Sequence, residues 1–398
     1  MEHPCVHEVR PVMSAPARVA IALSFLAFSV SSISAVARAA PVLTGYVFPQ
    51  GRQIAPGDLD ASEITRINYA FARIENGRMV EGFPTDAANL AGMTALRQSH
   101  PGLAVLISVG GWTWSDGFSD AALLPQSRAV FVESAVEFIR RYQLDGVDVD
   151  WEYPGQAGAG HAFRSEDKQN FTLLLRDLRA AMDQEGRREQ RRLYLTIAAG
   201  ASSDFLQHTE MRKVQRFVDA VNLMAYDYYS PAGDSITGNH APLLTDPADP
   251  KQASADASVR AFEAAGVPAA KIVLGIPFYG RMWADVPDEE HGLFQPGRQP
   301  SNDDLPYRDI QSTMVGVGFT RYWDNAAQVP FLYNPQTRQF VSYEDPESAA
   351  AKSRYALAHK LQGVMFWSFF NDPSGQLLHA ITQVLYGPGS ALKRSGGE

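Results

Sequence analysis

From Pro41 onward, short apolar runs alternate with amphipathic stretches along the chain. Eight of the runs have the length of buried strands: 42–48, 67–71, 104–109, 146–151, 193–198, 220–225, 272–276 and 363–367. Helical patterns lie between them, for example at 128–142, 166–182 and 253–265. Eight strands joined by helical crossovers predict an α/β fold with a parallel sheet, closed into a (β/α)8 TIM barrel. An open doubly wound sheet is the alternative, but no glycine-rich phosphate turn follows the first strand.

The stretch between the seventh and eighth predicted strands is too long for a simple crossover. Residues 281–345 are rich in aromatic residues, Pro and Gly, with strand-like pieces at 315–323 and 339–343. A structureless loop of that length is uncommon inside a compact domain. We therefore expect an α+β insertion domain at 281–345, followed by a last crossover helix at 347–359. The barrel then comprises 40–280 and 346–388, and a disordered tail follows at 389–398.

The first forty residues have a different pattern. Two arginines precede an apolar run at 19–30, which is followed by a serine-rich stretch and a small-residue site ending at Ala39. This order of basic, apolar and small-residue regions predicts a secretory signal peptide over 1–39, cleaved near Ala39. The apolar run is too short to span a bilayer as a helix. Cleavage would also remove Cys5, the only cysteine, so the exported protein would have neither disulfides nor a thiolate metal site.

Composition and charge narrow the class of protein. The 398 residues are 45% apolar and 20% charged, as in a soluble globular enzyme. The formal net charge of -9 and a pI near 5.5 argue against nucleic acid as the main partner. We therefore expect no nucleic-acid partner, no contact with a membrane after cleavage of the signal peptide, and a monomer.

The most informative stretch is 145–152, which reads Asp-Gly-Val-Asp-Val-Asp-Trp-Glu. Asp148, Asp150 and Glu152 alternate with apolar residues, so a strand would place the three carboxylates on one face, roughly 7 Å apart. Like charges in a row repel each other and do not stabilise a fold, so the row predicts catalysis. A solvated strand face would carry interspersed bases, and a calcium loop would need glycine where Tyr153 stands.

The ends of the predicted strands indicate where this site lies. In α/β barrels the active site is at the C-terminal ends of the strands. Pro154 ends the fourth strand just after Glu152, so Glu152 is expected at the rim, with the aspartates deeper. At 108–112, 224–227 and 365–367, polar groups and large aromatic residues replace the Val and Ile that fill a closed barrel mouth. Together with the end of the acidic strand, these three strand ends predict an active site.

The acidic octet matches the Asp-x-x-Asp-x-Asp-x-Glu signature of glycoside hydrolase family 18, the chitinases. The chain resembles this family from Gly45-Tyr46 through 108–111, 224–227 and 275–281 to Trp367. The insertion resembles the α+β domain of the chitinase subgroup whose binding cleft it deepens. The resemblance implies retaining hydrolysis of β-1,4 bonds between N-acetylglucosamine units, with no metal and no cofactor. The reaction would be substrate-assisted, because the 2-acetamido carbonyl attacks the anomeric carbon and forms an oxazolinium ion.

The resemblance also implies roles for single residues. Glu152 matches the general acid and base, Asp150 the residue that orients the acetamido N–H, and Tyr226 the hydroxyl that holds the acetamido oxygen. Asp148 would share a proton with Asp150, and these neighbours should raise the pKa of Glu152. Further candidates for sugar contact are Asp227, Trp367, Met224, Trp112, Arg281, Trp283 and Tyr153, and candidates for support of the Asp pair are Tyr46, Ser108, Asp145 and Phe71. The three other tryptophans, Trp114, Trp151 and Trp323, are expected in packing roles.

Two other functions remain open. A non-catalytic chitin-binding lectin on the same fold typically lacks the acid, which is present here as Glu152. An endo-β-N-acetylglucosaminidase acting on N-glycans, or an enzyme acting on peptidoglycan, uses the same octet, so the octet does not exclude either. The insertion and the Trp-bearing segments favour a long polymeric ligand, since substrate choice depends on loops.

Overall fold

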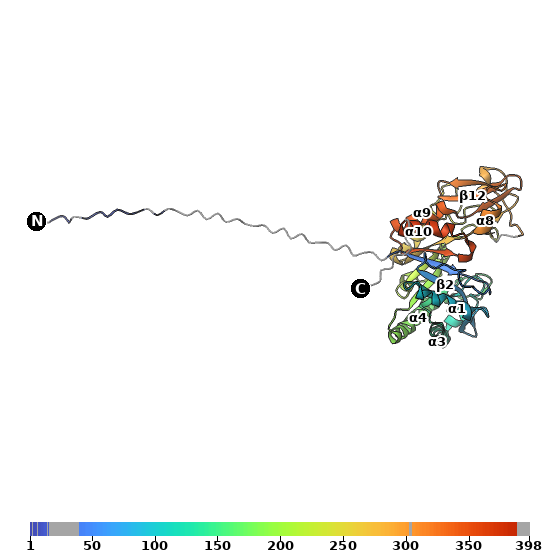
Figure 1. The fold of residues 1–398 in the computed structure, drawn as a ribbon, viewed down its shortest axis with the longest axis horizontal. Coiled ribbons are helices and arrows are strands. Elements are labelled where there is room, and N and C mark those ends of the chain that lie inside the picture. Colours follow the sequence, from blue (N-terminus) through green and yellow to red (C-terminus); the bar gives the residue numbers. More distant parts are fainter. Residues whose placement is uncertain (2, 6, 14, 16–39, 302–304, 388–398) are drawn as a thin grey trace. The chain divides into compact units, whose positions relative to one another are not determined.

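Eight parallel strands close into a barrel (Figure 1). They are β1 (Val42–Val47), β2 (Arg66–Glu75), β4 (Ala104–Gly110), β5 (Gly146–Asp150), β6 (Tyr194–Gly200), β7 (Ala220–Met224), β8 (Ile272–Pro277) and β14 (Gly363–Trp367). Each strand pairs with the next, and β1 pairs with both β14 and β2, which closes the ring. Each corresponds to one of the eight predicted runs, so the predicted TIM barrel is confirmed.

The computed structural model describes residues 1, 3–5, 7–13, 15, 40–301 and 305–387. The chain divides into two units, Met1–Ala39 and Ala40–Glu398, and the helices and strands belong to the second. The apolar run and cleavage region of the predicted signal peptide, and the predicted tail at 389–398, lie outside the described residues. Within the described part of the chain, no helix is long and apolar enough to cross a membrane.

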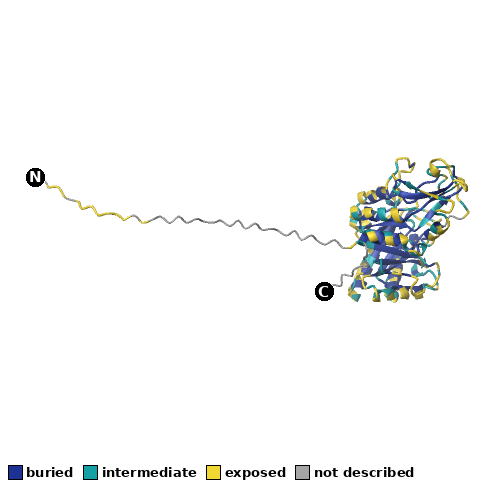
Figure 2. Ribbon diagram, turned by 45° about the horizontal axis from the view of Figure 1, so that its top comes forward, coloured by how far each residue is buried: buried dark blue, intermediate teal, exposed yellow. Residues whose placement is uncertain are grey.

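Helices cover the outside of the barrel (Figure 1). The longer ones are α1 (Asp86–Ala95), α3 (Pro125–Tyr142), α4 (Asp167–Glu189), α7 (Ala255–Ala264), α9 (Pro346–Ala358) and α10 (Gln376–Tyr386). The shorter ones are α2 (Phe118–Leu123), α5 (Ser203–Gln207) and α6 (Met211–Val214), with 3-10 turns at Leu96–Gln98, Ala269–Lys271, Glu290–Gly292 and Phe369–Asn371. Figure 2 shows buried residues on the strands and exposed residues on the outer faces of the helices.

A second, antiparallel sheet forms the insertion between β8 and β14. Its order is β10 (Leu305–Pro306), β9 (Tyr279–Trp283), β13 (Gln339–Ser342), β12 (Val329–Asn334) and β11 (Thr320–Asp324), and α8 (Tyr307–Thr313) packs with it. Alternate residues of β12 and β13 belong to two separate apolar clusters, because neighbouring side chains on a strand face opposite ways. The sheet begins at Tyr279, two residues before the boundary expected from the sequence.

The two faces of the barrel strands differ in polarity. Outward-facing residues such as Val147 and Val149 join the main apolar core under the helices. Six inward-facing residues are polar yet buried: Thr44, Asn68, Ser108, Asp148, Thr196 and Asn222 are each 0% exposed. The barrel interior therefore holds polar side chains beside apolar ones such as Val273 and Met365, and the catalytic candidates lie at its upper end.

Strand β2 extends beyond the barrel and forms a hairpin with β3 (Arg78–Glu81). A bulge between Ala70 and Ala72 shifts its register with β4. At the end of β4, Gly110 has a φ of +105°, and a Cβ there would lie 2.3 Å from the carbonyl oxygen of Asp150. Only glycine allows β4 to approach the acidic strand this closely.

Candidate active site

Asp148 lies in the middle of the barrel interior and is held by four side chains. Its Oδ2 accepts hydrogen bonds from Tyr46 Oη and Ser108 Oγ, both at 2.9 Å. Its Oδ1 accepts one from Asn222 Nδ2 at 3.0 Å and one from Thr196 Oγ1. Burial raises the pKa of Asp148, and these four donors oppose that rise because they favour the ionised carboxylate.

Asp150 and Glu152 form a hydrogen-bonded carboxyl pair above Asp148. Burial first, and then the charges of Glu152 and Asp148, raise the pKa of Asp150 well above its usual value. Burial also raises the pKa of Glu152 to about 7, while its hydrogen bonds with Tyr153 and Asp150 oppose the rise. The expected rise in the Glu152 pKa is present, with burial as its largest cause. Two carboxyl groups can share a hydrogen bond only if one of them holds a proton.

The partner of Asp150 differs from the sequence expectation. We expected Asp148 to share a proton with Asp150, but the hydrogen bond of Asp150 is with Glu152, and Asp148 acts on it only through its charge. The reason is that both Asp148 oxygens already accept bonds from four other donors. The second oxygen of Asp150, Oδ1, is buried and has no hydrogen-bond partner among the described residues. Buried acceptors of this kind are rare.

Ser115 fixes the backbone at the base of Glu152. Its Oγ donates to the carbonyl oxygens of Gly111 and Asp150 and accepts the N–H of Glu152 at 2.9 Å. The Glu152 side chain itself is half-buried. Glu152 thus lies at the rim on an anchored backbone, where its carboxyl group is open to a ligand.

The end of β7 brings a second polar group to the rim. Asp227 accepts hydrogen bonds from Tyr279 Oη and Arg281 Nε, both at 2.7 Å, and His240 Nδ1 lies 3.6 Å away. Burial raises the pKa of Asp227, but the bonds from His240 and Arg281 outweigh it and hold the pKa below its usual value. Asp227 is therefore ionised, and it links the barrel to strand β9 of the insertion sheet.

Tyr226 precedes Asp227 and is half-buried beside the same carboxyl groups. Burial, and then the charges of Asp150 and Glu152, raise the pKa of Tyr226 well above its usual value. Its hydroxyl group therefore keeps its proton and can donate a hydrogen bond. A Cβ at Gly275 would lie 2.8 Å from the Tyr226 ring, so glycine at that position makes room for the side chain.

Aromatic side chains form the floor beside the carboxyl groups. Trp367 is half-buried at the end of β14, with ring centroids 5.7 Å from Tyr46 and 5.5 Å from both Phe48 and Phe71. Its ring stacks on Phe71 at an interplanar angle of 22°. Met224 packs against the same cluster. The sequence candidates Trp367, Met224, Tyr46 and Phe71 are thus brought together at one end of the barrel.

Trp112 lies two residues after the end of β4, beside Tyr153. Its side chain is 52% exposed, and its ring centroid lies 6.5 Å from that of Tyr153, the hydrogen-bond partner of Glu152. His161 Nε2 contacts the Trp112 carbonyl oxygen at 2.7 Å and ties this loop to the loop after β5. An exposed tryptophan next to the acid is a surface on which a sugar ring can stack.

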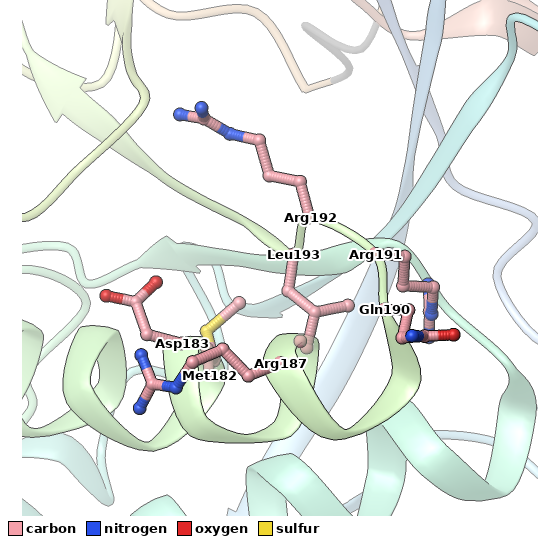
Figure 3. A pocket seen from close by; sticks show the side chains of 8 residues that line it. Met182, Asp183, Arg187, Gln190, Arg191, Arg192 and Leu193 are labelled. Atoms are coloured by element: carbon pink, nitrogen blue, oxygen red, sulfur yellow. The ribbon is translucent and has the colours of Figure 1, made fainter.

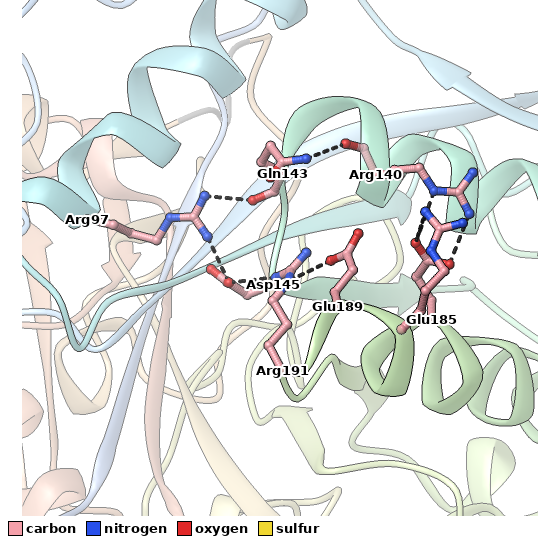
Figure 4. A network of polar contacts seen from close by, with 8 residues as sticks. Arg97, Arg140, Gln143, Asp145, Glu185, Glu189 and Arg191 are labelled. Carbon is pink, nitrogen blue, oxygen red and sulfur yellow. Dashed lines mark hydrogen bonds and ion pairs between the residues drawn. The ribbon is translucent and has the colours of Figure 1, made fainter.

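Two candidates lie away from the site. Trp283 was expected to line the cleft, but it is fully buried in the apolar cluster of the insertion sheet and donates its indole N–H to the Asp234 carbonyl oxygen. That expectation is wrong, because no face of the ring is open to a ligand. Asp145 was expected behind the Asp pair, but it lies before the start of β5, at the far end of the barrel, and pairs with Arg97 and Arg191 (Figure 4). It therefore supports the bottom of the barrel and does not support Asp148.

Several residues that build the site carry no strong sequence signal. Asn222 and Thr196 bind Asp148 from neighbouring strands, and Asn222 also donates to Tyr46 Oη at 3.1 Å. A period-two pattern on β6 and β7 could have indicated that they face inward together with the acids. Ser115, Phe48, Tyr279 and His240 are in loops or in the insertion, where spacing along the chain does not predict proximity.

No metal site accompanies the carboxyl groups: within the described ranges, no cluster of three His, Cys, Asp or Glu side chains could hold an ion. A separate hollow of about 420 Å³ lies between the end of α4 and the start of β6 (Figure 3). It is lined by Met182, Asp183, Gly186, Arg187, Gln190, Arg191, Arg192 and Leu193. None of these belongs to the acidic octet, so the hollow is not part of the candidate active site.

A TIM barrel with a proton-sharing carboxyl pair at its C-terminal rim, between aromatic surfaces, has the site of a glycoside hydrolase. The family model for glycosyl hydrolases family 18 matches residues 42–372, and the chain belongs to this family. It is therefore a family 18 glycoside hydrolase with chitinases among its relatives.

Three similar proteins illustrate the relationship. Chitinase A1 of Niallia circulans is 37% identical over 383 residues, which cover 81% of this chain but 55% of chitinase A1. This chain thus spans about half the length of that relative. The solved structure of a family 18 N-acetylglucosaminidase from Paenibacillus barengoltzii gives a TM-score of 0.81 at 41% identity, covering 86% of this chain and 99% of that one. A mutant class V chitinase from Nicotiana tobaccum in complex with NAG4 gives 0.79 at 28% identity, covering 88% and 99%.

Proposed function

We propose that the protein is a chitinase that hydrolyses β-1,4 bonds of chitin and its oligomers with retention of configuration. The observation that carries this proposal is the hydrogen-bonded Asp150–Glu152 pair, in which the pKa of the rim carboxyl, Glu152, is about 7. A carboxyl group that is still protonated near neutral pH can protonate a glycosidic oxygen and, once ionised, activate water. Glu152 would serve as this general acid and base.

In the proposed reaction the substrate supplies the nucleophile. The 2-acetamido carbonyl oxygen attacks the anomeric carbon, the glycosidic C–O bond breaks, and the proton of Glu152 goes to the leaving oxygen. Water then attacks the oxazolinium ion and gives its proton back to Glu152. The unpaired Oδ1 of Asp150 suits the acetamido N–H, and the protonated hydroxyl of Tyr226 suits the acetamido oxygen. No other carboxylate has to act as nucleophile, and the nearby Asp227 is already bound to Tyr279 and Arg281.

Two aromatic surfaces near the carboxyl groups, Trp367 and Trp112, support a chain of several sugars as the substrate. Trp367 would carry the sugar whose anomeric carbon is attacked, and exposed Trp112 would carry the sugar on the leaving side. The complex of the tobacco class V chitinase mutant with NAG4 is consistent with such a ligand.

A second candidate is an enzyme that releases single N-acetylglucosamine units. The similarity to the N-acetylglucosaminidase of Paenibacillus barengoltzii favours it, since that relative is matched over 99% of its chain. Endo-β-N-acetylglucosaminidase action on N-glycans and action on peptidoglycan also use the same octet. The products distinguish these activities, because each cuts at a different place in a different glycan.

The test is to incubate the purified protein with colloidal chitin and with soluble N-acetylglucosamine oligomers, and to separate the products by length. Products of two or more sugars are expected; release of monomer alone would favour the exo-acting candidate. Cleavage of an N-glycoprotein without cleavage of chitin would contradict the proposal and favour an endo-β-N-acetylglucosaminidase. Binding without cleavage would favour a lectin. An oligomer with free 2-amines should resist cleavage, because it lacks the internal nucleophile.

We also propose that the protein is exported and that residues 1–39 are removed. The support is the order of basic, apolar and small residues in this segment. Expression of the full chain in a bacterial secretion host, followed by N-terminal sequencing of the extracytoplasmic protein, is expected to give a start at Ala40. Protein that remains inside the cell with its first residues intact would overturn the proposal.

A further inference from the structure

A buried arginine closes the lower end of the barrel interior. Arg66 is the first residue of β2 and is 4% exposed. Its guanidinium carbon lies 5.1 Å from the centre of the Tyr194 ring, at the start of β6. Strands β4 and β5 separate β2 from β6 in the ring, so the Arg66 side chain crosses the barrel interior. The Arg192 guanidinium also lies over Tyr194, at 5.6 Å, on an exposed side chain.

The strand register shows that Arg66 points inward. Asn68, two residues after Arg66, is paired with Tyr46, whose hydroxyl group donates to Asp148 inside the barrel. Residues two apart on a strand share a face, so Arg66 and Asn68 both face the interior. The register partner of Arg66 on β1 is Thr44, another inward-facing buried residue.

The same register places the guanidinium below Asp148. Tyr194 is two residues before Thr196, which pairs with Asp148 across β5 and β6 and donates to it. Two residues of a strand rise by roughly 7 Å. Because Arg66 stacks on Tyr194, its charge lies about one side-chain layer beneath the Asp148 carboxylate.

Several polar atoms of the barrel interior, two of them on Arg66, lack hydrogen-bond partners among the described residues. Nε and Nη1 of Arg66, Oγ1 of Thr44, both amide atoms of Asn68 and Oδ1 of Asn222 are buried without a hydrogen bond among the described residues. Buried polar atoms are nearly always hydrogen-bonded, often to ordered internal water. The interior between Arg66 and Asp148 therefore holds several polar atoms, beside the apolar side chain of Leu106, the register partner of Asn68 on β4.

The pairing of the buried cations also supports an interaction between Arg66 and the carboxyl groups above it. Of the buried cations in the described chain, Arg128 pairs with Asp177 and Lys352 pairs with Glu344, whereas no carboxylate lies within ion-pair distance of Arg66. Burial lowers the pKa of Arg66, while Tyr194, Asp148, Asp219 and Tyr46 raise it. An arginine nevertheless keeps its proton at any pH at which the protein is folded. Three carboxyl groups lie above this charge, and buried charges are normally compensated.

We propose that Arg66 is a positioning residue for catalysis, whose charge beneath Asp148 keeps that carboxylate ionised. An ionised Asp148 leaves the shared proton on the Asp150–Glu152 pair, where the general acid needs it. The inference rests on the proposed function of Glu152. It adds Arg66, at the lower end of the barrel interior, to the residues that set the charge of the catalytic carboxyl groups. The titratable groups that interact with Arg66 or Asp148 are Tyr46, Asp150, Tyr194, Asp219 and Tyr226, and the exposed Arg192 lies over the Tyr194 ring.

The test compares Arg66→Met, which removes the charge, with Arg66→Lys, which keeps it. The pH dependence of kcat/KM is measured on a soluble N-acetylglucosamine oligomer. Loss of a positive charge raises carboxyl pKa values. In Arg66→Met, the acid limb and the alkaline limb of the kcat/KM profile are therefore both expected to move to higher pH by about one unit. Arg66→Lys should keep the limbs within a few tenths of a unit of the unmodified protein.

Arg128→Met is the matched control, because Arg128 is equally buried but lies on α3 and is paired with Asp177. It should lower Tm without moving either limb. Identical limbs in Arg66→Met and the unmodified protein would overturn the proposal, whatever the loss of stability. If the unmodified protein does not cleave the oligomer, the proposed function fails instead.

A measurement of Tm needs no substrate, so it tests the role of Arg66 even if the protein does not cleave the oligomer. The loss of Tm in Arg66→Met, relative to Arg66→Lys, should widen from pH 4 to pH 7, because Asp148 must then ionise without compensation. A loss of Tm that is the same at both pH values would overturn the proposal independently of catalysis.

Discussion

The carboxyl groups of Asp150 and Glu152 share a hydrogen bond at the end of β5, while both oxygens of Asp148 are held by other side chains. The three acids are therefore not equivalent. Asp148 is held by four donors that favour its ionised form, and the pair above it shares a proton. This division explains how a row of three carboxyl groups is accommodated in one strand, because only part of the row is charged at a time.

Replacement of Glu152 by Gln is expected to lower kcat by about 10²–10⁴-fold, because the amide cannot transfer a proton. Ligand affinity should be retained, since the amide has nearly the same shape. The measurements are kcat on a soluble oligomer and Kd by calorimetry. Glu166→Gln, an exposed change at the start of α4, is the control and should leave kcat unchanged. A Glu152→Gln variant with unchanged kcat would exclude Glu152 as the acid.

The raised pKa of Glu152 predicts the alkaline limb of the activity profile. The acid form is needed for the first step, and the pKa of this carboxyl is about 7. The rate kcat/KM should therefore fall as the pH rises through about 7. Initial rates between pH 4 and pH 9 on a soluble oligomer check this. An alkaline limb near the usual value for glutamate, 4.5, would show that burial does not hold the proton on Glu152.

The same shift has a consequence for stability. Between about pH 4.5 and 7, Glu152 is protonated in the folded state and ionised in the unfolded state. The folded state then binds more protons, so the free energy of unfolding decreases as the pH rises through this window. Glu152→Gln removes this titration, and its Tm relative to the unmodified protein is expected to rise between pH 5 and pH 8. A constant difference in Tm over that range would contradict the prediction.

The position of a site residue could be predicted from the sequence where the residue lies on a barrel strand. The period-two acids placed Asp148 and Asp150 correctly on β5, because strand geometry fixes which side chains share a face, and Glu152 follows two residues after the strand ends. The same reasoning placed Trp367 at the end of β14. It failed for Asp145, because the strand starts at Gly146 and the residue before it turns to the arginines at the lower rim.

Contacts that cross between strands or loops were beyond sequence reasoning. The binding of Asp148 by Asn222 depends on strand register, which one sequence does not specify. Non-proline cis peptide bonds follow Ala70, Glu152 and Trp367, and such bonds have no signature in a sequence. Trp283 was misplaced because a large aromatic residue near a cleft and one in a core look alike in sequence.

Trp367→Ala should reduce kcat/KM on the order of 10²-fold, because it removes the stacking surface beside the carboxyl pair. Trp323→Ala is the matched control: this half-buried tryptophan lies on β11 of the insertion and stacks with Arg321. It should leave kcat/KM unchanged after correction for the folded fraction. Equal losses in the two variants would show that the effect of Trp367 is one of stability alone.

Trp283→Ala tests the corrected role of that residue. A fully buried tryptophan at the centre of an apolar cluster should destabilise the protein by about 3–5 kcal/mol when truncated, measured by denaturant unfolding. Trp283→Phe keeps the aromatic contacts and loses the hydrogen bond to Asp234, so about 1 kcal/mol is expected. Phe163→Ala, at a residue that is 51% exposed, should change the free energy of unfolding by less than about 0.5 kcal/mol. A rise in the KM of Trp283→Ala with little loss of stability would contradict the burial of Trp283. That result would show that its side chain contacts the sugar.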